Sequence, residues 1–183
     1  MYKSKKILAV IPARGGSKRV PHKNLRVFRG KPLVRWAMEH AKASRHIDRW
    51  VVSTEDAEIM KHAGSDALER PAYLAADKTP TESVLVHALY ALPGYDYAVL
   101  LQPTSPLRSV EDIDRCLEIA IDQHGVSGLT GCVSYNPWGK RNGAIYVCNV
   151  EHFRQFLSFD AAHHYEMPME RSLDVDYAWD FDQ

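Results

Sequence analysis

The sequence has no acidic residue before Glu39, although 11 lysines and arginines precede that position. It has no apolar run that approaches the roughly 20 residues of a membrane-spanning helix. Cysteines are few, and Cys116, Cys132 and Cys148 are odd in number, widely spaced and surrounded by apolar residues. This pattern is typical of buried free thiols, so we expect no disulfide framework, no zinc site and no membrane-spanning segment.

The chain also lacks the features of a secreted or a nucleic-acid-binding protein. Its short amino-terminal apolar stretch runs into Pro12 and Arg14 without a small-residue cleavage site, so we expect a cytoplasmic protein. Lysine plus arginine and aspartate plus glutamate both total 23, and the early cations gather in one loop rather than along a helix. A neutral chain with this pattern is a poor match to DNA or RNA.

Signatures of nucleophilic catalysis and of a Walker loop are absent as well. The chain contains no G-x-S-x-G, no GxxxxGK[ST] and no metal-ligand spacing among its nine histidines. Its acids are concentrated at the far end, where seven of them accompany one arginine, Arg171, from Asp160 onward. A basic beginning and an acidic end therefore require a common explanation.

Apolar runs alternate with helical periodicity along the chain. The pattern predicts strands at Ile7–Ile11, Trp50–Ser53, Tyr97–Leu101, Leu129–Ser134, Ala144–Val147 and Leu173–Asp176. It predicts helices at Leu33–Ala43, Ala57–Ala63, Ser83–Leu92 and Val110–Asp122, with a helical turn at Phe153–Leu157. This alternation favours an α/β protein with one domain over residues 1–183, built as a three-layer α/β/α sandwich around a mostly parallel sheet.

The loop after the first predicted strand has the composition of a phosphate site. It carries two glycines and a serine among four cations: Arg14, Gly15, Gly16, Ser17, Lys18, Arg19 and Lys23. Glycines allow backbone N–H groups to approach a phosphate, and the cations neutralise its charge. Open α/β sheets bind their ligands at the carboxyl ends of their strands, so this loop is predicted to hold a polyphosphate.

Polar motifs follow other predicted strands too, and such loops converge on one edge of the sheet. Gln102 lies in a loop that Pro103 and Pro106 stiffen, so it is either a positioned ligand contact or part of a rigid turn. Asp174 and Asp176 are spaced to project from the same face of a strand. They form either a solvated acidic edge or, next to a polyphosphate, a magnesium site that faces the glycine-rich loop across one cleft.

Six motifs in a fixed order carry a resemblance over almost the whole chain. IPARGGSKRVPHKN matches an IPARxGSKxxxxKN loop, and VSTEDAEI, RPAYLAADKTP, LQPTSPLR, NGAIYV and SLDVDYAWDF match the later motifs of the same family. The chain resembles the cytidylyltransferases that make CMP-activated acidic sugars, among them the CMP-N-acylneuraminate (CMP-sialic acid) synthetases and their legionaminate, pseudaminate and Kdo relatives. The resemblance implies a Rossmann-like sheet of the nucleotide-diphospho-sugar transferase type.

The resemblance also implies a reaction and a set of residues. CMP would pass from CTP to a hydroxyl of an N-acylneuraminate or related nonulosonate with release of pyrophosphate, and Mg²⁺ would be the cofactor. The catalytic residues would be Arg14, Lys23, Asp174 and Asp176, of which the two aspartates would bind the metal. CTP would contact Ala13, Arg14, Gly15, Ser17, Lys23, Asn24 and Arg70, and the sugar would contact Gln102 and Asn142.

One segment departs from the family pattern. Between Trp138 and Asn142 the chain has only Gly139, Lys140 and Arg141, where the family carries a longer segment with dimer contacts and part of the sugar pocket. A homodimer therefore stays an open alternative that would have to form without the family's usual dimer segment. Lys140 and Arg141 either replace lost anion contacts or form a solvated turn. Three alternative interpretations remain. The acceptor could be a smaller acid or a phosphonate, the donor could be another nucleotide, or the protein could bind CTP without catalysis.

Overall fold

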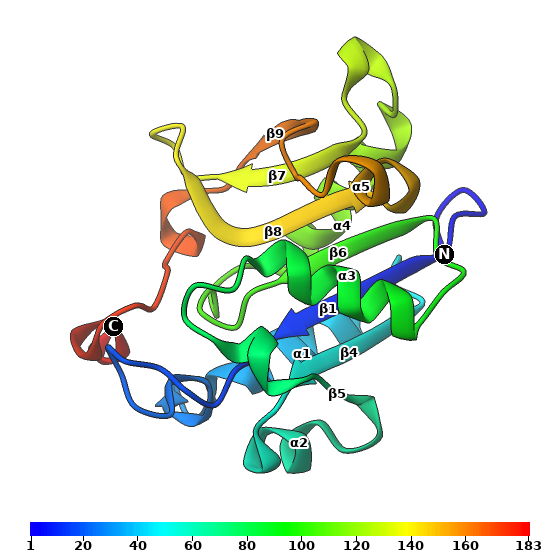
Figure 1. Ribbon diagram of the computed structural model, residues 1–183. Coiled ribbons are helices and arrows are strands. Elements are labelled where there is room, and N and C mark those ends of the chain that lie inside the picture. The colour runs from blue at the N-terminus through cyan, green and yellow to red at the C-terminus, as the bar shows by residue number, and fades with distance from the viewer.

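The computed structural model describes residues 1–183, and a seven-stranded sheet runs through its middle (Figure 1). The strand order is β5-β4-β1-β6-β8-β7-β9, and β8 alone runs antiparallel to its neighbours, which confirms a mostly parallel sheet. The strands are β1 (Ile7–Pro12), β4 (Arg49–Thr54), β5 (Ala67–Glu69), β6 (Tyr97–Leu101), β7 (Gly131–Tyr135), β8 (Arg141–Asn149) and β9 (Ala162–Glu166), while β2 (Val27–Phe28) and β3 (Lys31–Pro32) form a separate pair.

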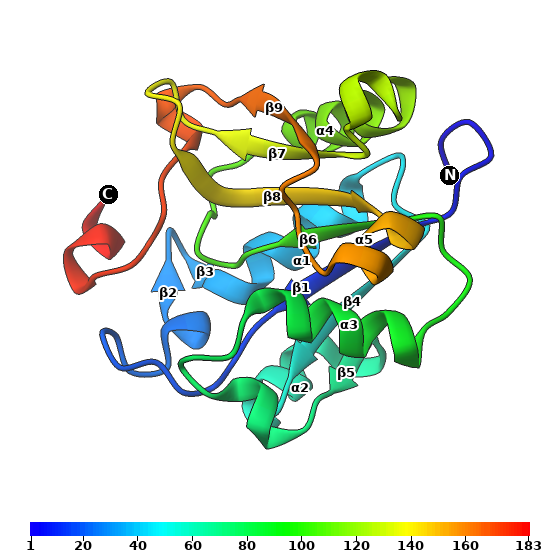
Figure 2. The same ribbon diagram turned by 45° about the horizontal axis from the view of Figure 1, so that its top comes forward.

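Helices cover both faces of this sheet (Figure 2), so the predicted three-layer sandwich is confirmed. One face carries α1 (Leu33–Ala43), α2 (Ala57–Ala63) and α4 (Val110–Asp122), and the other carries α3 (Thr81–Ala91) and α5 (Val150–Phe156). Short 3₁₀ turns lie at Lys23–Leu25, Gly64–Asp66, Ala72–Ala75, Val126–Gly128, Met169–Arg171 and Ala178–Asp182.

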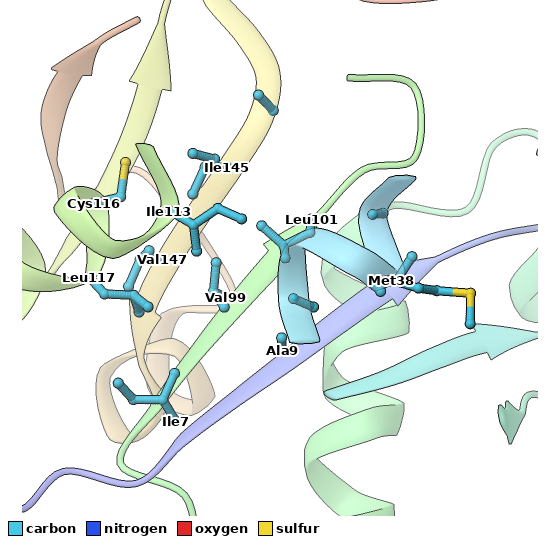
Figure 3. Close-up of a cluster of buried hydrophobic side chains, with 14 of the residues drawn as sticks. Ile7, Ala9, Met38, Val99, Leu101, Ile113, Cys116, Leu117, Ile145 and Val147 are labelled. Carbon is cyan, nitrogen blue, oxygen red and sulfur yellow. The ribbon is translucent and has the colours of Figure 1, made fainter. Parts of the chain in front are cut away.

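The central strand β1 contributes side chains to both layers of the core. Ile7, Ala9 and Ile11 pack under α1 and α4, whereas Leu8 and Val10 pack under α3 and α5. Figure 3 shows the first of these clusters, in which β1, β6 and β8 meet α1 and α4. A strand covered on both faces must be apolar throughout, which is why this run was recognisable in the sequence. The three cysteines are free and buried, as predicted.

Most predicted elements lie where the sequence placed them. The helices α1, α2 and α4 and the strand β6 have the predicted bounds, and α3, α5, β1, β4, β7 and β8 differ by a few residues at their ends. The capping of α4 explains its sharp start, since Ser109 and Asp112 form a reciprocal capping box. The short strands β5 and β9 were not predicted, because three residues give no periodicity and β9 (AHHYE) is polar.

The strand predicted at Leu173–Asp176 is wrong, because these residues pair with no strand of either sheet. The sheet ends at β9, and the chain then crosses toward the amino-terminal loop, where the red carboxyl end lies beside the blue segment in both views (Figure 1, Figure 2). The apolar residue between the two aspartates is nevertheless inward. Val175 is fully buried against Phe28 and Leu33, and its N–H donates to the Thr104 carbonyl at 2.7 Å.

The reversed direction of β8 has a consequence for the site. In a wholly parallel sheet the start of this strand would lie at the amino-terminal edge, opposite the glycine-rich loop. Because β8 is antiparallel to β6, its first residues lie at the edge where β1 and β6 end.

None of the helices is both long and apolar enough to cross a membrane.

Candidate active site

A polar cavity of about 380 Å³ lies at the carboxyl ends of β1 and β6. We call it the main cleft. It is lined by Pro12, Arg14, Ser17, Lys23, Asn24, Arg70, Leu74, Ala76, Asp77, Thr79, Thr81, Val84, Gln102, Pro103, Thr104, Asp174 and Asp176. Eight of the residues singled out from the sequence are among them: Arg14, Ser17, Lys23, Asn24, Arg70, Gln102, Asp174 and Asp176. The other three, Ala13, Gly15 and Asn142, do not line the main cleft.

The glycine loop, residues 13–24, is fixed to neighbouring strands before it reaches the cleft. The N–H of Ala13 donates to the Ser53 carbonyl at 3.0 Å, which extends the pairing of β1 with β4. The N–H of Gly15 donates to Glu55 Oε1 at 2.8 Å. The same carboxylate accepts from Arg70 Nε at 3.0 Å, so Glu55 joins the loop to the buried arginine.

Gly15 is required for packing in this structure. A Cβ at this position would lie 2.2 Å from Asp56 Oδ2, and Asp56 is the N-cap of α2. The N–H of Gly15 is already bonded to Glu55, whereas a Cβ on Gly16 would meet nothing within 4 Å. The expected approach of glycine N–H groups to a phosphate is therefore not visible at Gly15, which serves the close contact between loop and helix.

The cations of the glycine loop are paired with acids from elsewhere in the chain. Arg14 Nη1 lies 2.7 Å from Asp77 Oδ1, and Lys18 Nζ lies 2.5 Å from the other oxygen of that carboxylate. The hydrogen bond from Lys18 and the nearby Arg14 guanidinium lower the pKa of Asp77. Asp77 thus neutralises two cations of the loop that the sequence predicted to hold a polyphosphate.

The acidic end of the chain meets the same loop. Lys23 Nζ donates to the Val175 carbonyl and to Asp176 Oδ1, both at 3.0 Å, and Arg19 Nη1 donates to Asp176 Oδ2 at 2.7 Å. Although burial opposes it, these two cations lower the pKa of Asp176. The expectation that the basic loop and the paired aspartates face each other in one cleft is confirmed.

Asp174 differs from Asp176 in its surroundings. Water reaches Asp174 through the cleft, yet the protein around it desolvates the carboxylate, and this burial together with the Asp176 charge raises its pKa. Gly143, with φ of +77°, lies beside it, and a Cβ there would be 3.7 Å from Asp174 Oδ2 and 3.8 Å from Gln102 Oε1. The absent side chain leaves room between these two oxygen donors.

The Gln102 loop is held from behind by a buried arginine. Arg108 Nη1 donates to the carbonyl oxygens of Gln102 at 2.8 Å and Ala144 at 2.7 Å. Burial without a contacting carboxylate lowers the pKa of Arg108 to about 9. Arg108 therefore ties the end of β6 to the start of β8, and Gln102 is both part of a rigid turn and a wall of the cleft.

Asn142 is placed at the correct edge but its side chain is committed to the protein. It is buried, its Oδ1 accepts from Ser134 Oγ at 2.7 Å, and its Nδ2 lies 3.2 Å from Ser172 Oγ. These bonds connect β7 and β8 to the carboxyl-terminal segment, residues 167–183. A contact between Asn142 and a sugar stays a prediction.

Four polar lining residues were not singled out from the sequence as site residues. They are Asp77, Thr79, Thr81 and Thr104. Asp77 and Thr79 belong to the quoted motif RPAYLAADKTP, and Thr104 belongs to LQPTSPLR. Their position within these motifs was the only indication in the sequence that they belong to the site. A single threonine in a loop does not by itself indicate a binding residue.

Sequence comparison places these observations in a family. A profile described as cytidylyltransferase matches residues 8–130. The chain is 29% identical to the N-acylneuraminate cytidylyltransferase of Escherichia coli O18:K1:H7, over 97% of this chain and 51% of that protein. It is 37% identical to the CMP-N,N'-diacetyllegionaminic acid synthase of Legionella pneumophila, over 84% of this chain and 82% of that protein. The chain thus spans about half the length of the first relative.

A solved structure shares the fold. The structure of a CMP:2-keto-3-deoxy-manno-octonic acid synthetase complexed with CTP matches with a TM-score of 0.72 at 18% identity, over 94% of this chain and 93% of that one. This likeness shows a shared fold, and the main cleft lies at the strand ends of that fold. The profile match over residues 8–130 shows that the chain belongs to the cytidylyltransferase family.

Proposed function

We propose that the protein transfers CMP from CTP to a hydroxyl group of an acidic sugar, an N-acylneuraminate or a related nonulosonate, and releases pyrophosphate. The observation that carries this proposal is the single polar cleft that joins the cationic glycine loop to Asp174 and Asp176. The relatives named for N-acylneuraminate and diacetyllegionaminic acid support the class of acceptor.

In such a reaction the protein contributes mainly by positioning the two substrates and by neutralising charge on the phosphates. The acceptor oxygen forms a bond to the α-phosphorus of CTP while the bond to pyrophosphate breaks in line. Arg14 and Lys23 are suited to stabilise the charge on the phosphate oxygens. Since both are paired with acids, we propose that the triphosphate takes the place of Asp77 beside Arg14 and of Asp176 beside Lys23.

The cleft fits a magnesium ion that the nucleotide helps to hold. No three or more His, Cys, Asp and Glu side chains are grouped to bind a metal by themselves. Proteins usually bind Mg²⁺ through one or two carboxylates plus substrate phosphates, and Asp174 and Asp176 offer those carboxylates. The raised pKa of Asp174 shows that its negative charge is unfavourable where it lies, and a bound cation would offset that charge. Gly143, which has no side chain, leaves room for a cation beside Asp174 Oδ2. When bound, the ion would polarise the phosphate oxygens and offset their charge.

Pyrophosphate release provides the test. The protein is incubated with Mg²⁺ and either CTP or UTP, across a panel of N-acetylneuraminate, other nonulosonates, Kdo and small phosphonates. We expect release with CTP and at least one acidic sugar, no release without Mg²⁺, and much slower release with UTP. Calorimetry with CTP alone measures nucleotide binding separately from turnover.

The two readouts separate the alternatives. CTP binding without turnover of any acid would contradict the proposed transfer and favour a non-catalytic CTP-binding protein. Turnover of a phosphonate alone would keep the nucleotide chemistry and replace the acidic sugar by a smaller acceptor.

A further inference from the structure

A second cavity of about 140 Å³ opens beside the main cleft. We call it the side pocket, and its lining is Thr81, Glu82, Gln102, Arg141, Tyr146 and Phe159. Thr81 and Gln102 line the main cleft too, so a molecule in the side pocket would lie next to the nucleotide. Glu82, Tyr146 and Phe159 have no role in the proposed reaction, and for Arg141 the sequence left open an anion contact or a solvated turn.

Arg141 is the only cation that lines the side pocket, and two of its three guanidinium nitrogens bond to the protein. Its Nε donates to the Tyr135 hydroxyl at 3.1 Å, and its Nη2 donates to Asp160 Oδ1 at 2.8 Å. A guanidinium has five N–H donors, so the remaining donors are free for a ligand. A planar fork that is already oriented loses little entropy when it binds a carboxylate.

The other walls of the side pocket favour one orientation of an acidic molecule. Glu82 repels a carboxylate and accepts hydrogen bonds from hydroxyl groups. Tyr146 and Phe159 lie with their ring centroids 5.2 Å apart and provide an apolar wall for a carbon skeleton. The helix α3 starts after Pro80 without a side-chain cap, which leaves the positive end of its dipole at the boundary with the main cleft.

We propose that the side pocket binds the carboxylate of the acceptor and that Arg141 is the residue that holds it. This inference rests on the proposed function. The skeleton of the acceptor lies against Tyr146 and Phe159, its other hydroxyl groups face Glu82, and its reactive hydroxyl extends past Gln102 toward the α-phosphate. The first residue of β8, directly after the tight hairpin, thus supplies an anion contact of its own.

The neighbouring cation serves as a matched control. Lys140 precedes Arg141 at the hairpin turn, is exposed, and lines neither the main cleft nor the side pocket. Its backbone closes the turn through Asn136, whose N–H donates to the Lys140 carbonyl at 2.8 Å. The sequence alone does not distinguish the two adjacent cations, whereas in the structure only Arg141 lines the side pocket.

The test compares each acid with its uncharged methyl ester in the presence of CTP and Mg²⁺. N-acetylneuraminate, Kdo and their methyl esters are used with wild-type protein and with Arg141→Gln, Arg141→Lys and Lys140→Gln. Because a hydrogen bond to a charged group is stronger than one between neutral groups, the wild type should prefer the acid by about 10- to 100-fold in kcat/KM.

The preference for the acid should fall to nearly onefold in Arg141→Gln, through a higher KM for the acceptor, while the KM for CTP stays the same. Arg141→Lys should recover part of the preference, because it keeps the charge without the fork. Lys140→Gln should keep all of it. Equal turnover of acid and ester by the wild type, or an unchanged preference in Arg141→Gln, would overturn this subsite and leave the proposed function standing. No CTP-dependent turnover of any acid would overturn both.

Discussion

The glycine loop and the carboxyl-terminal segment meet in one cleft, but different forces position them. The loop continues a buried central strand, and its backbone is bonded to β4 and to Glu55. The carboxyl-terminal segment has no strand partner beyond β9. Its aspartates are placed by three anchors: Arg171, which donates to Asp112 of α4, Val175 in a small core cluster, and Lys23 from the glycine loop itself.

This difference matters for binding, because the positions of Asp174 and Asp176 depend on contacts that a ligand can disturb. Lys23 and Arg19 hold Asp176 in the structure, and the same cations are suited to a triphosphate. Local stability is low where few backbone hydrogen bonds and few buried side chains hold a segment. We therefore expect the carboxyl-terminal segment to respond to CTP more strongly than the glycine loop does.

The largest effect should follow from removing a carboxylate of the proposed metal pair. Asp176→Asn is expected to lower magnesium-dependent pyrophosphate release by 100-fold or more, since one lost charge contact to a transition state costs on the order of 3 kcal/mol. Asp182→Asn changes an exposed acid of the same segment and should leave the rate unchanged. Full activity of Asp176→Asn, with circular dichroism showing an intact fold, would remove Asp176 from the metal site.

The next effect tests the anchor of the carboxyl-terminal segment. Arg171 Nε and Nη2 donate to both oxygens of Asp112 at 2.9 Å, and Asp112 is completely buried at the start of α4. Because Arg171→Gln leaves a buried carboxylate short of its cation, it should cost about 2 kcal/mol of unfolding free energy and loosen residues 167–183.

Hydrogen exchange and urea unfolding measure these two effects. Glu170→Gln serves as the control, since Glu170 is exposed and its oxygen is 3.9 Å from Arg171. If exchange in residues 167–183 were the same in Arg171→Gln and in the wild type, the anchor would not be what positions the aspartates.

A smaller effect is expected on the glycine-loop side. Gly15→Ala places a methyl group against Asp56, so either the loop or the cap of α2 must move. We expect a loss of about 1 to 2 kcal/mol of stability and weaker CTP binding, from overpacking and a damaged N-cap. Gly16→Ala meets no atom within 4 Å and should be tolerated. Calorimetry with CTP and thermal unfolding of both variants decide the matter, and equal behaviour would contradict the packing role of Gly15.

The same contrast explains what the sequence predicted. Elements that bury a regular face were recognisable, so α1, α4, β1 and β6 were found, and with them the edge of the sheet where the glycine loop begins. Ordered motifs then added Arg70 and Gln102 to the same cleft. Both steps depend on local periodicity or on short segments that can be read one at a time.

Long-range contacts were beyond such reasoning. The alternation around Val175 resembled a strand, but it arises from one apolar anchor between two cleft aspartates. The commitment of Asn142 to Ser134 and Ser172, and the separation of Arg141 from Lys140, depend on how β8 meets distant segments. No spacing within the sequence encodes these partners.

The smallest effect concerns two acids whose pKa values move in opposite directions. Although burial opposes it, the hydrogen bonds from Arg171, Ser109 and Tyr165 lower the pKa of Asp112 in the folded state. Ionised Asp112 therefore stabilises the fold above its unfolded pKa of about 4, and this contribution is lost as the pH falls through its lower folded pKa. Burial and Asp176 raise the pKa of Asp174, so its ionisation opposes folding at neutral pH. This penalty shrinks as the pH falls through the raised folded pKa and is gone below the unfolded pKa of about 4.

Asp174→Asn should accordingly raise the melting temperature at pH 7, by only on the order of 1 °C because water reaches the carboxylate, and leave it unchanged at pH 3. The gain should accompany a loss of pyrophosphate release, as expected where a binding site holds charge at the expense of stability. Melting curves of Asp174→Asn and wild type between pH 3 and 8 provide the measurement. A lower melting temperature of Asp174→Asn at pH 7 would mean that ionised Asp174 stabilises the cleft without a ligand. It would contradict the expectation that the charge of Asp174 is unfavourable until a cation binds.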